Sequence, residues 1–79
     1  MESEKKLLDD INSGSRAAMH RLYERYVGYA MAVALRYVPV RDDAEDVVQD
    51  SFIKVFSGIS KFEYRGEGAL QAWLLRIVT

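Results

Sequence analysis

An isoleucine lies among acidic and amide side chains in the stretch Asp42–Phe56, which reads DDAEDVVQDSFIKVF. At about 100° per residue, a helix over this stretch has one polar face. That face carries Ile53 in the middle of Asp42, Asp46, Gln49, Asp50 and Ser57. An apolar side chain within a rim of carboxylates is typical of a patch that binds a basic protein partner. A single apolar residue on a solvated face stays open as the alternative, because much of any folded surface is apolar.

Recognition, rather than catalysis, is the chemistry that these residues suit. The chain has no cysteine and one histidine, His20, which we expect at the boundary of the core rather than as a ligand or base. The sequence has no pairing of a nucleophile with a base, no phosphate-binding glycine loop and no set of metal ligands. We therefore expect that the protein is not an enzyme and uses no cofactor or metal.

Helices must position these side chains, and the spacing of apolar residues predicts where they lie. They are expected at residues 3–12, 16–38, 42–57 and 69–78, with a loop over residues 59–68. Signals of β-hairpins are missing from the sequence. The expected fold class is all-α, a compact bundle of about four helices.

Local signals mark the ends of these helices. Gly14 suits a helix C-terminus and Ser15 suits the N-cap of the next helix, which Pro39 then stops. Asp42 and Glu45 resemble a capping box with aspartate in place of serine or threonine. We therefore expect the third helix to begin at Asp42.

The same spacing predicts the core. In the second helix the expected core residues are Met19, Leu22, Tyr23, Tyr26, Val27, Ala30, Val33, Ala34 and Tyr37. In the third helix they are Ala44, Val47, Val48, Ser51, Phe52, Val55 and Ile59. The last helix is apolar on nearly every side, which predicts a central, buried position and core packing for Trp73.

Length and composition limit the remaining possibilities. A chain of 79 residues forms one small domain, and without cysteine it has neither disulfides nor a zinc-thiolate site. Its charged N-terminal stretch excludes a secretory signal, and its most apolar run, residues 29–35, is far shorter than the roughly 20 residues of a membrane span. We expect a cytoplasmic protein.

Charge is segregated along the chain, although the net charge is only −1. Residues 13–41 carry five arginines against one acidic residue, and residues 42–52 carry five acidic residues and no basic one. This order predicts two differently charged surfaces and two partners. Helices with solvated faces of different charge would explain it as well.

The acidic stretch and its neighbours together resemble a known family. DAEDVVQDSFIKVF is similar to the segment with which extracytoplasmic-function (ECF) sigma factors bind the clamp helices of bacterial RNA polymerase. Upstream, RLYERYVGYAMAVALRYV resembles the long helix that precedes that segment. Downstream, SKFEYRGEGALQAWLLRIV resembles the promoter-reading loop and the helix behind it. The resemblance covers residues 5–79 and implies the fold of sigma region 2.

This resemblance implies a transcription initiation factor domain. The domain would bind the RNA polymerase core and would recognise and melt the promoter minus-ten element. Asp46, Gln49 and Asp50 would pair with basic and polar groups of the clamp helices, while Ile53 fills an apolar depression beside them. Charged residues at such a rim guide encounter, and burial of the central aliphatic group slows dissociation.

The resemblance also implies that the loop KFEYRGEG holds a base of the non-template strand. A flipped base is held by stacking and hydrogen bonds, with positive charge near the backbone beside it. In this loop a lysine and an arginine suit phosphates, a tyrosine suits stacking or hydrogen bonding, and glycines let the main chain approach. The expected DNA-binding residues are Lys61, Tyr64, Arg65, Gly66, Glu67, Arg76 and Arg36. Without the resemblance, a flexible surface loop that closes a helical hairpin is the alternative.

A stripe of arginines and small residues lies along the second helix. It consists of Arg21, Arg25, Gly28, Ala32 and Arg36. We expect Arg21 and Arg25 to form a solvated face with carboxylate partners such as Glu24 and the acidic third helix, and we retain Arg36 as a DNA candidate. Close approach of a strand or another helix to this stripe is the alternative.

A helical protein-interaction module without a nucleic-acid role is the competing function. The two functions differ in whether the protein binds DNA in a salt-dependent way. The chain stops at Thr79 without a helix cap, so we expect a fragment that lacks the family's domain for the minus-thirty-five element. The resemblance also brings an anti-sigma factor into consideration as a partner.

Overall fold

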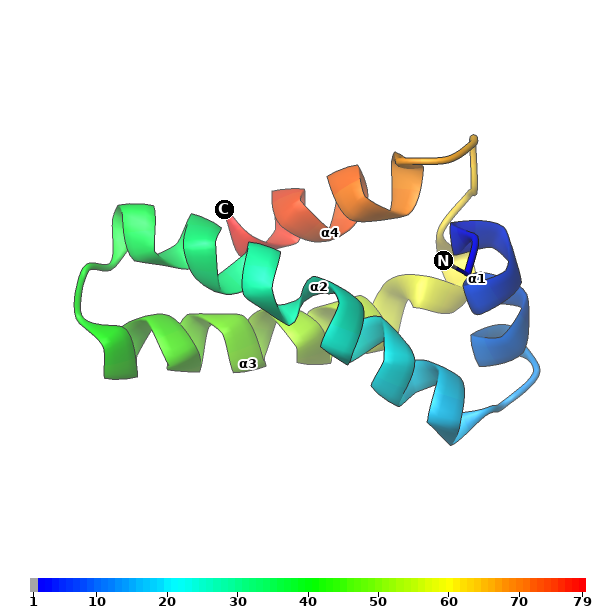
Figure 1. Ribbon diagram of the computed structural model, residues 1–79, viewed down its shortest axis with the longest axis horizontal. Helices are drawn as coiled ribbons and strands as arrows, with labels where there is room; N and C mark the ends of the chain where they lie inside the picture. The colour runs from blue at the N-terminus through cyan, green and yellow to red at the C-terminus, as the bar shows by residue number, and fades with distance from the viewer. Residues whose placement is uncertain (1) are drawn as a thin grey trace.

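Five helical segments follow one another along the computed structural model, which describes residues 2–79 (Figure 1). They are α1 (Glu4–Asn12), α2 (Arg16–Tyr37), α3 (Arg41–Gly58), the short 3₁₀ helix η1 (Ile59–Lys61) and α4 (Ala69–Val78). The part of the chain that the structure describes has no β-strand. The predicted all-α class is confirmed, and each of the four predicted α-helices is present within one residue of its expected ends.

Serine side chains begin the first two helices. The hydroxyl of Ser3 accepts a hydrogen bond from the Lys6 N–H at 3.1 Å, and that of Ser15 accepts one from the Ala18 N–H at 3.0 Å. Each bond satisfies a backbone donor that has no partner inside its helix. Between the two helices, Gly14 has a φ of 98°, a left-handed conformation that suits glycine at a helix C-terminus. The predictions for Gly14 and Ser15 are confirmed.

The turn between α2 and α3 differs from the prediction at one point. Val38, the residue before Pro39, is extended and ends α2 as expected. The capping box at Asp42 was wrong, because α3 begins at Arg41 and its N-cap is Val40, which has no side-chain cap. Asp42 instead lies inside the first turn, where a negative charge is favourable at the positive end of the helix dipole.

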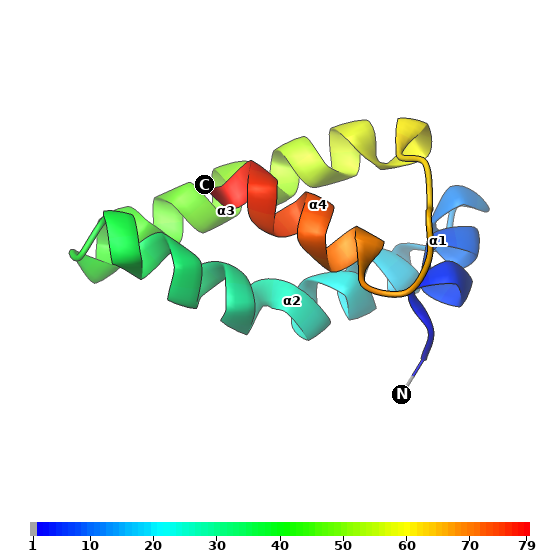
Figure 2. The same cartoon turned by 90° about the horizontal axis from the view of Figure 1, so that it is seen from above.

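The helices pack so that α1 lies at the end of the bundle where α4 begins, and α4 then runs away from that end toward the C-terminus (Figures 1 and 2). α2 and α3 form an antiparallel hairpin, and α4 lies across both and runs in the same direction as α2 (Figures 1 and 2). α1 packs at the end of the bundle where α2 begins and α3 ends. It therefore lies beside the segment 62–68, which leads into α4.

One apolar cluster joins all of these helices. Its buried members are Leu7, Leu8, Ile11, Ala18, Leu22, Tyr26, Ala30, Ala34, Ala44, Val48, Phe52, Val55, Ile59, Leu70, Leu74 and Val78. Alanine occupies three of the five buried positions of α2, which allows the neighbouring helices to pack closely against it. Trp73 packs as predicted, with its ring 4.8 Å from that of Phe62 between centroids.

Two core predictions need correction. Tyr37 is 69% exposed. The buried residues of α2 recur at every fourth position, so the line that they form moves around the helix by about 40° at each step. By the end of α2 this line of buried residues has turned away from Tyr37. The last helix is less buried than expected: Leu70, Leu74 and Val78 face the core, whereas Ala72 is exposed.

The close packing of α2 predicts opposite effects for the same substitution at two alanines. Ala30→Leu adds a bulky side chain at a fully buried site and should lower the free energy of unfolding by about 1–3 kcal/mol. Ala32→Leu, on the exposed side of the same helix, should change it by less than about 0.5 kcal/mol. Urea denaturation followed by circular dichroism measures both values. Equal midpoints for the two variants would contradict this packing.

Candidate functional site

The outer face of α3 presents the predicted binding residues on one continuous surface. We name Asp46, Gln49, Asp50 and Ile53 the α3 patch. All four are exposed, and with Val47 they line a depression of about 410 Å³. The side chain of Ile53 is 64% exposed. Burying an aliphatic side chain of this size contributes about 1.5–3 kcal/mol, so a partner that covers Ile53 gains a substantial part of that free energy.

The carboxylates of the α3 patch have no ion-pair partner in the described part of the chain. No ion pair within residues 2–79 involves Asp46 or Asp50. Glu45, by contrast, lies 3.3 Å from the guanidinium of Arg41 one turn earlier. The patch therefore keeps an apolar centre and uncompensated carboxylates, which favour a basic partner.

Gln49 of the patch is held in place by α2. Its Nε2 donates a hydrogen bond to the Tyr23 hydroxyl at 3.2 Å, and the Tyr23 ring packs on Phe52 with 4.8 Å between centroids. On this side a second depression, of about 330 Å³, adjoins the first and shares Asp46 and Gln49 with it. Its α2 lining consists of Tyr23, Val27 and Met31. The available surface thus extends from α3 toward α2.

The 62–68 loop carries the second group of predicted site residues. Tyr64 is partly buried, and its hydroxyl donates a hydrogen bond to Glu67 Oε2 at 3.2 Å. Desolvation, together with this bond to Glu67, raises the pKa of the Tyr64 phenol. Arg65 is exposed and lies 3.3 Å from the carboxylate of Glu63. Exposed ion pairs of this kind contribute little to stability, so a phosphate group can replace the Glu63 carboxylate beside Arg65 at little cost in free energy.

The two glycines of the loop are required by the backbone. Gly66 and Gly68 have φ angles of 127° and 93°, in a region that other residues rarely adopt. The Ala69 N–H donates a hydrogen bond to the Gly66 carbonyl at 3.0 Å and closes the turn. A Cβ atom at either glycine would meet nothing within 4 Å, so the main chain here is open to a ligand.

The structure brings some of the predicted DNA-binding residues together and separates others. Tyr64, Arg65, Gly66 and Glu67 form the loop, and the exposed Lys61 directly precedes it. Arg76 is exposed in the last turn of α4, roughly 10 Å further along the helix axis. Arg36 is exposed in the last turn of α2, at the opposite end of the bundle from the loop. The loop and Arg36 therefore cannot contact the same nucleotide.

Arg21 and Arg25 on α2 pair with carboxylates, as expected, but with different ones. Arg21 lies 3.1 Å from Glu2 and 3.1 Å from Asp10. Arg25 donates a hydrogen bond to the Glu2 carbonyl at 2.6 Å and lies 3.6 Å from Glu67 of the loop. Glu2 precedes α1, Asp10 lies in α1 and Glu67 lies in the loop, whereas the prediction placed the partners on α2 and α3.

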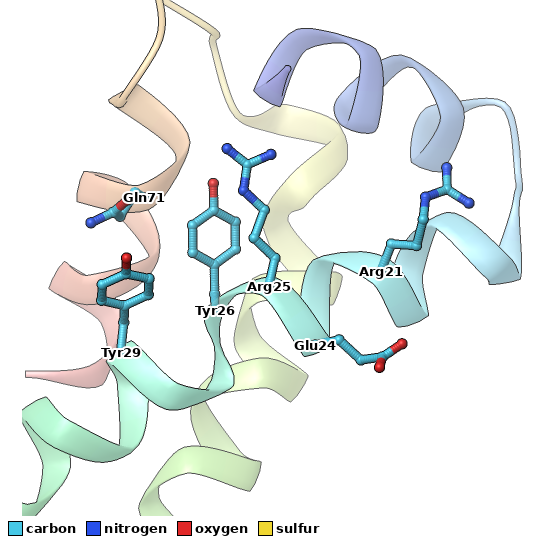
Figure 3. Close-up of a pocket in the computed structure, with 6 residues that line it drawn as sticks. All are labelled: Arg21, Glu24, Arg25, Tyr26, Tyr29 and Gln71. Carbon is cyan, nitrogen blue, oxygen red and sulfur yellow. The ribbon is translucent and has the colours of Figure 1, made fainter. Parts of the chain in front are cut away.

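A pocket of about 500 Å³ lies between these arginines and α4 (Figure 3). In Figure 3, Arg25 and Tyr26 project from the same side of α2, and the guanidinium carbon of Arg25 is 5.2 Å from the Tyr26 ring centroid. His20 lies 2.8 Å from Glu24 of this lining, and its side chain is exposed, so it is not the boundary residue that was expected. The lining residues are Arg21, Glu24, Arg25, Tyr26, Tyr29 and Gln71.

Sequence reasoning missed Glu4, whose side chain is only 1% exposed. Its Oε1 accepts hydrogen bonds from the Gly68 N–H at 2.9 Å and the Leu70 N–H at 3.1 Å. Its Oε2 accepts from the Gln71 N–H and from the Tyr26 hydroxyl, both at 3.1 Å. These four bonds compensate for the removal of a carboxylate from water.

A sequence signal for such a contact exists, although it does not name the partner. The residues before α4 read RGEG, and its N-cap, Gly68, has no side chain that can accept from the first turn. Donors at the start of a helix that is packed against a core need a partner. The missing cap therefore indicates a distant acceptor, but Glu4 is 64 residues away along the chain from Gly68.

Other kinds of site are not found in the described part of the chain. Within residues 2–79 no group of three or more histidine, cysteine or acidic side chains could hold a metal ion. Across the same residues, no helix combines the length and the apolar character that crossing a membrane requires.

Comparison with known proteins identifies relatives over most of the chain. Residues 22–79 match the family Sigma-70 region 2. The chain is 39% identical over 75 residues to the ECF RNA polymerase sigma-E factor of Haemophilus influenzae, which covers 95% of this chain and 38% of that protein. It is 38% identical over 71 residues to the factor of the same name from Salmonella typhimurium and 37% identical to that from Escherichia coli K12, with 90% of this chain and 36% of each relative covered. The chain thus spans less than two fifths of the length of these relatives.

The bond between Tyr26 and Glu4 predicts how stability depends on alkaline pH. In the folded protein, burial and, to a smaller extent, the charge of Glu4 raise the pKa of the Tyr26 phenol. A tyrosine in the unfolded chain ionises at about pH 10. The contribution of Tyr26 to stability is therefore fully present below about pH 10, and it is lost as the pH rises further. Urea midpoints measured from pH 9 to about pH 11.5 should fall more steeply for the wild type than for Tyr26→Phe.

Tyr37→Phe is the matched control, since Tyr37 is exposed. Its midpoints should follow those of the wild type across this pH range. Equal pH dependence of the wild type and Tyr26→Phe would contradict the coupling of Tyr26 to the buried carboxylate.

Proposed function

Because the chain belongs to the Sigma-70 region 2 family, we propose that it is the domain of an ECF sigma factor that docks on bacterial RNA polymerase and reads promoter DNA. The single observation that carries the proposal is the α3 patch. Its apolar centre, Ile53, is exposed within carboxylates that have no partner among residues 2–79. A docking surface has this composition, and a surface that only keeps a protein in solution does not need it.

In the proposed complex the patch binds the clamp helices of the polymerase. Asp46 and Asp50 pair with basic groups at the rim, and Ile53 enters an apolar depression on the clamp helices. Gln49 adds a hydrogen-bonding amide that Tyr23 keeps in place. The neighbouring depression on the α2 side gives the partner a wider surface than one helix provides. An anti-sigma factor would be a further partner, acting by covering the patch or the loop.

The 62–68 loop is the proposed contact for the non-template strand of the minus-ten element. Lys61 and Arg65 are exposed for phosphates, and Tyr64 offers a ring and a hydroxyl to an unstacked base. Arg76 would extend this path along α4. Arg36 lies too far from the loop to share a nucleotide with it, so its proposed contact is with the backbone of a more distant segment.

The proposed role is one of binding rather than catalysis. Residues 1–79 would act as one region 2 unit, and reading of the minus-thirty-five element would belong to a different domain. The protein would act in the cytoplasm, where the polymerase and the chromosome are found.

Substitution of the patch centre tests the docking proposal. Ile53→Asp places a charge where an apolar contact is expected and should weaken binding of core polymerase by about thirtyfold or more, as expected for a residue at the centre of an interface. Asp50→Asn, at the rim, should weaken it by only about two- to fivefold, mainly through slower association. Affinity and rates are measured by surface plasmon resonance with purified bacterial core polymerase.

Val40→Asp is the matched control, because Val40 is also an apolar residue, is 57% exposed and lies at the start of α3, outside the patch. It should leave the affinity within about twofold of wild type. Unchanged binding by Ile53→Asp, with the fold intact by circular dichroism, would refute the proposed docking.

Salt dependence tests the DNA proposal and separates it from a protein-interaction module. The complex of this chain with core polymerase should bind a single-stranded oligonucleotide with an affinity that falls as salt rises. Arg65→Ala should make the slope of log affinity against log salt less steep by roughly 0.7, the value for one phosphate contact on a single strand. Lys5→Ala, which removes an exposed lysine of α1 that pairs with Asp9, should leave the slope unchanged.

These measurements use fluorescence anisotropy at four or more salt concentrations. If adding the chain to core polymerase creates no oligonucleotide binding at any salt, the chain is an interaction module and the DNA role is refuted.

A further inference from the structure

The start of α4 is capped by a residue from the other end of the chain. Gly68 provides no capping side chain, and the first backbone N–H groups of α4 instead donate hydrogen bonds to Glu4. The Glu4 carboxylate binds the N–H groups of Gly68, Leu70 and Gln71 at 2.9–3.1 Å. One side chain therefore does the work of a helix cap and also fixes the last residue of the 62–68 loop.

The position of Glu4 suits a negative charge. It is the first residue of α1, so the N-terminal ends of α1 and α4, both positive ends of helix dipoles, face the same carboxylate. The fourth donor to this carboxylate is the Tyr26 hydroxyl, which comes from α2. α1, α2 and α4 thus meet at Glu4.

This contact holds one end of a loop whose other end is held separately. At its beginning, Phe62 packs against Trp73 at 4.8 Å between ring centroids. At its end, Gly68 is bound by Glu4. Between these two points lie Tyr64 and Arg65, the proposed contacts for the base and the phosphate. Loss of the Glu4 contact would release one end of the loop and change the direction in which the loop enters α4.

The α3 patch does not depend on the same contact. Its residues lie on the outer face of α3, and Gln49 is supported by Tyr23. None of the hydrogen bonds made by Glu4 reaches α3. Changing Glu4 should therefore affect the loop and leave the docking surface in place.

We propose that Glu4 is the positioning residue of the DNA-reading loop: its carboxylate, by capping α4 and binding Gly68, holds the 62–68 loop in the conformation that accepts an unpaired nucleotide. This inference rests on the proposed function of the loop. It goes beyond the family match, because Glu4 precedes the matched residues 22–79. Glu4 acts through the loop and does not itself contact the nucleotide.

Glu4→Gln tests this role because it keeps the size of the side chain but replaces one acceptor oxygen with an NH₂ group facing backbone donors. The complex of core polymerase with the variant should bind single-stranded DNA at least about tenfold more weakly than the wild-type complex, as expected for loss of hydrogen bonds to a charged group. Affinity for core polymerase should stay within twofold. The probe is a fluorescent oligonucleotide selected by the wild-type complex from a randomised pool.

Two further variants separate positioning from general stability. Glu2→Gln, which removes the same charge from the N-terminal segment but contacts Arg21 instead of the loop, should leave both affinities within twofold. Glu4→Asp restores the negative charge on a side chain one methylene shorter and should recover part of the lost DNA affinity. If Glu4→Gln does not fold at the assay temperature, a comparison of Glu4→Asp with the wild type decides the question, because DNA affinity should then fall while polymerase affinity does not.

The results that overturn the inference differ from those that overturn the proposed function. DNA affinity equal to wild type in a folded Glu4→Gln variant would refute the role of Glu4 and leave the function intact. A parallel loss of polymerase and DNA binding in Glu4→Gln and Glu4→Asp would refute it as well, since that pattern indicates only a less stable domain. Failure of the wild-type complex to select any oligonucleotide would refute the DNA role of the loop itself.

Discussion

A single buried carboxylate, that of Glu4, joins α1 to the start of α4, and the proposed conformation of the 62–68 loop depends on it. Apart from Glu4 and Ser51 the buried residues are hydrophobic, and apolar packing sets how closely the helices approach without fixing the direction of the loop that joins them. The directional hydrogen bonds that the Glu4 carboxylate accepts from the N–H groups of Gly68, Leu70 and Gln71 supply that constraint. They also satisfy donors at the start of α4 that would otherwise be buried without partners, which is costly in a small domain.

The structure places the two proposed binding surfaces on different elements. The α3 patch lies on the outer face of one helix of the hairpin, whereas the 62–68 loop lies at the end of the bundle beside α1. The acidic segment of the sequence supplies the α3 patch, whereas the loop carries Arg65 together with Glu63 and Glu67. The two proposed partners, a basic protein surface and a nucleic acid, would therefore contact different side chains of the domain.

Much of this fold could be predicted from the sequence because its signals are local. Ser15 and Pro39 bound a helix through their own chemistry, and helical periodicity alone puts Ile53 on the outer face of α3. The errors have physical causes of a different kind. Asp42 has the composition of a cap, but α3 begins one residue earlier, at Arg41, so Asp42 falls within its first turn. The missing cap of α4 is visible in the sequence, but its partner Glu4 is not, because that contact depends on where α4 lies in space.

The central claim is that Ile53 and its acidic rim meet the polymerase while the core of the domain stays unchanged. The chain contains four isoleucines, Ile11, Ile53, Ile59 and Ile77, so methyl labelling gives one probe in the patch and three elsewhere. In methyl NMR spectra recorded as core polymerase is added, we expect the Ile53 resonance to shift most, while those of the buried Ile11 and Ile59 keep the environment of the free domain. An unchanged Ile53 environment in the bound state, with shifts at the other three methyl groups, would contradict this account.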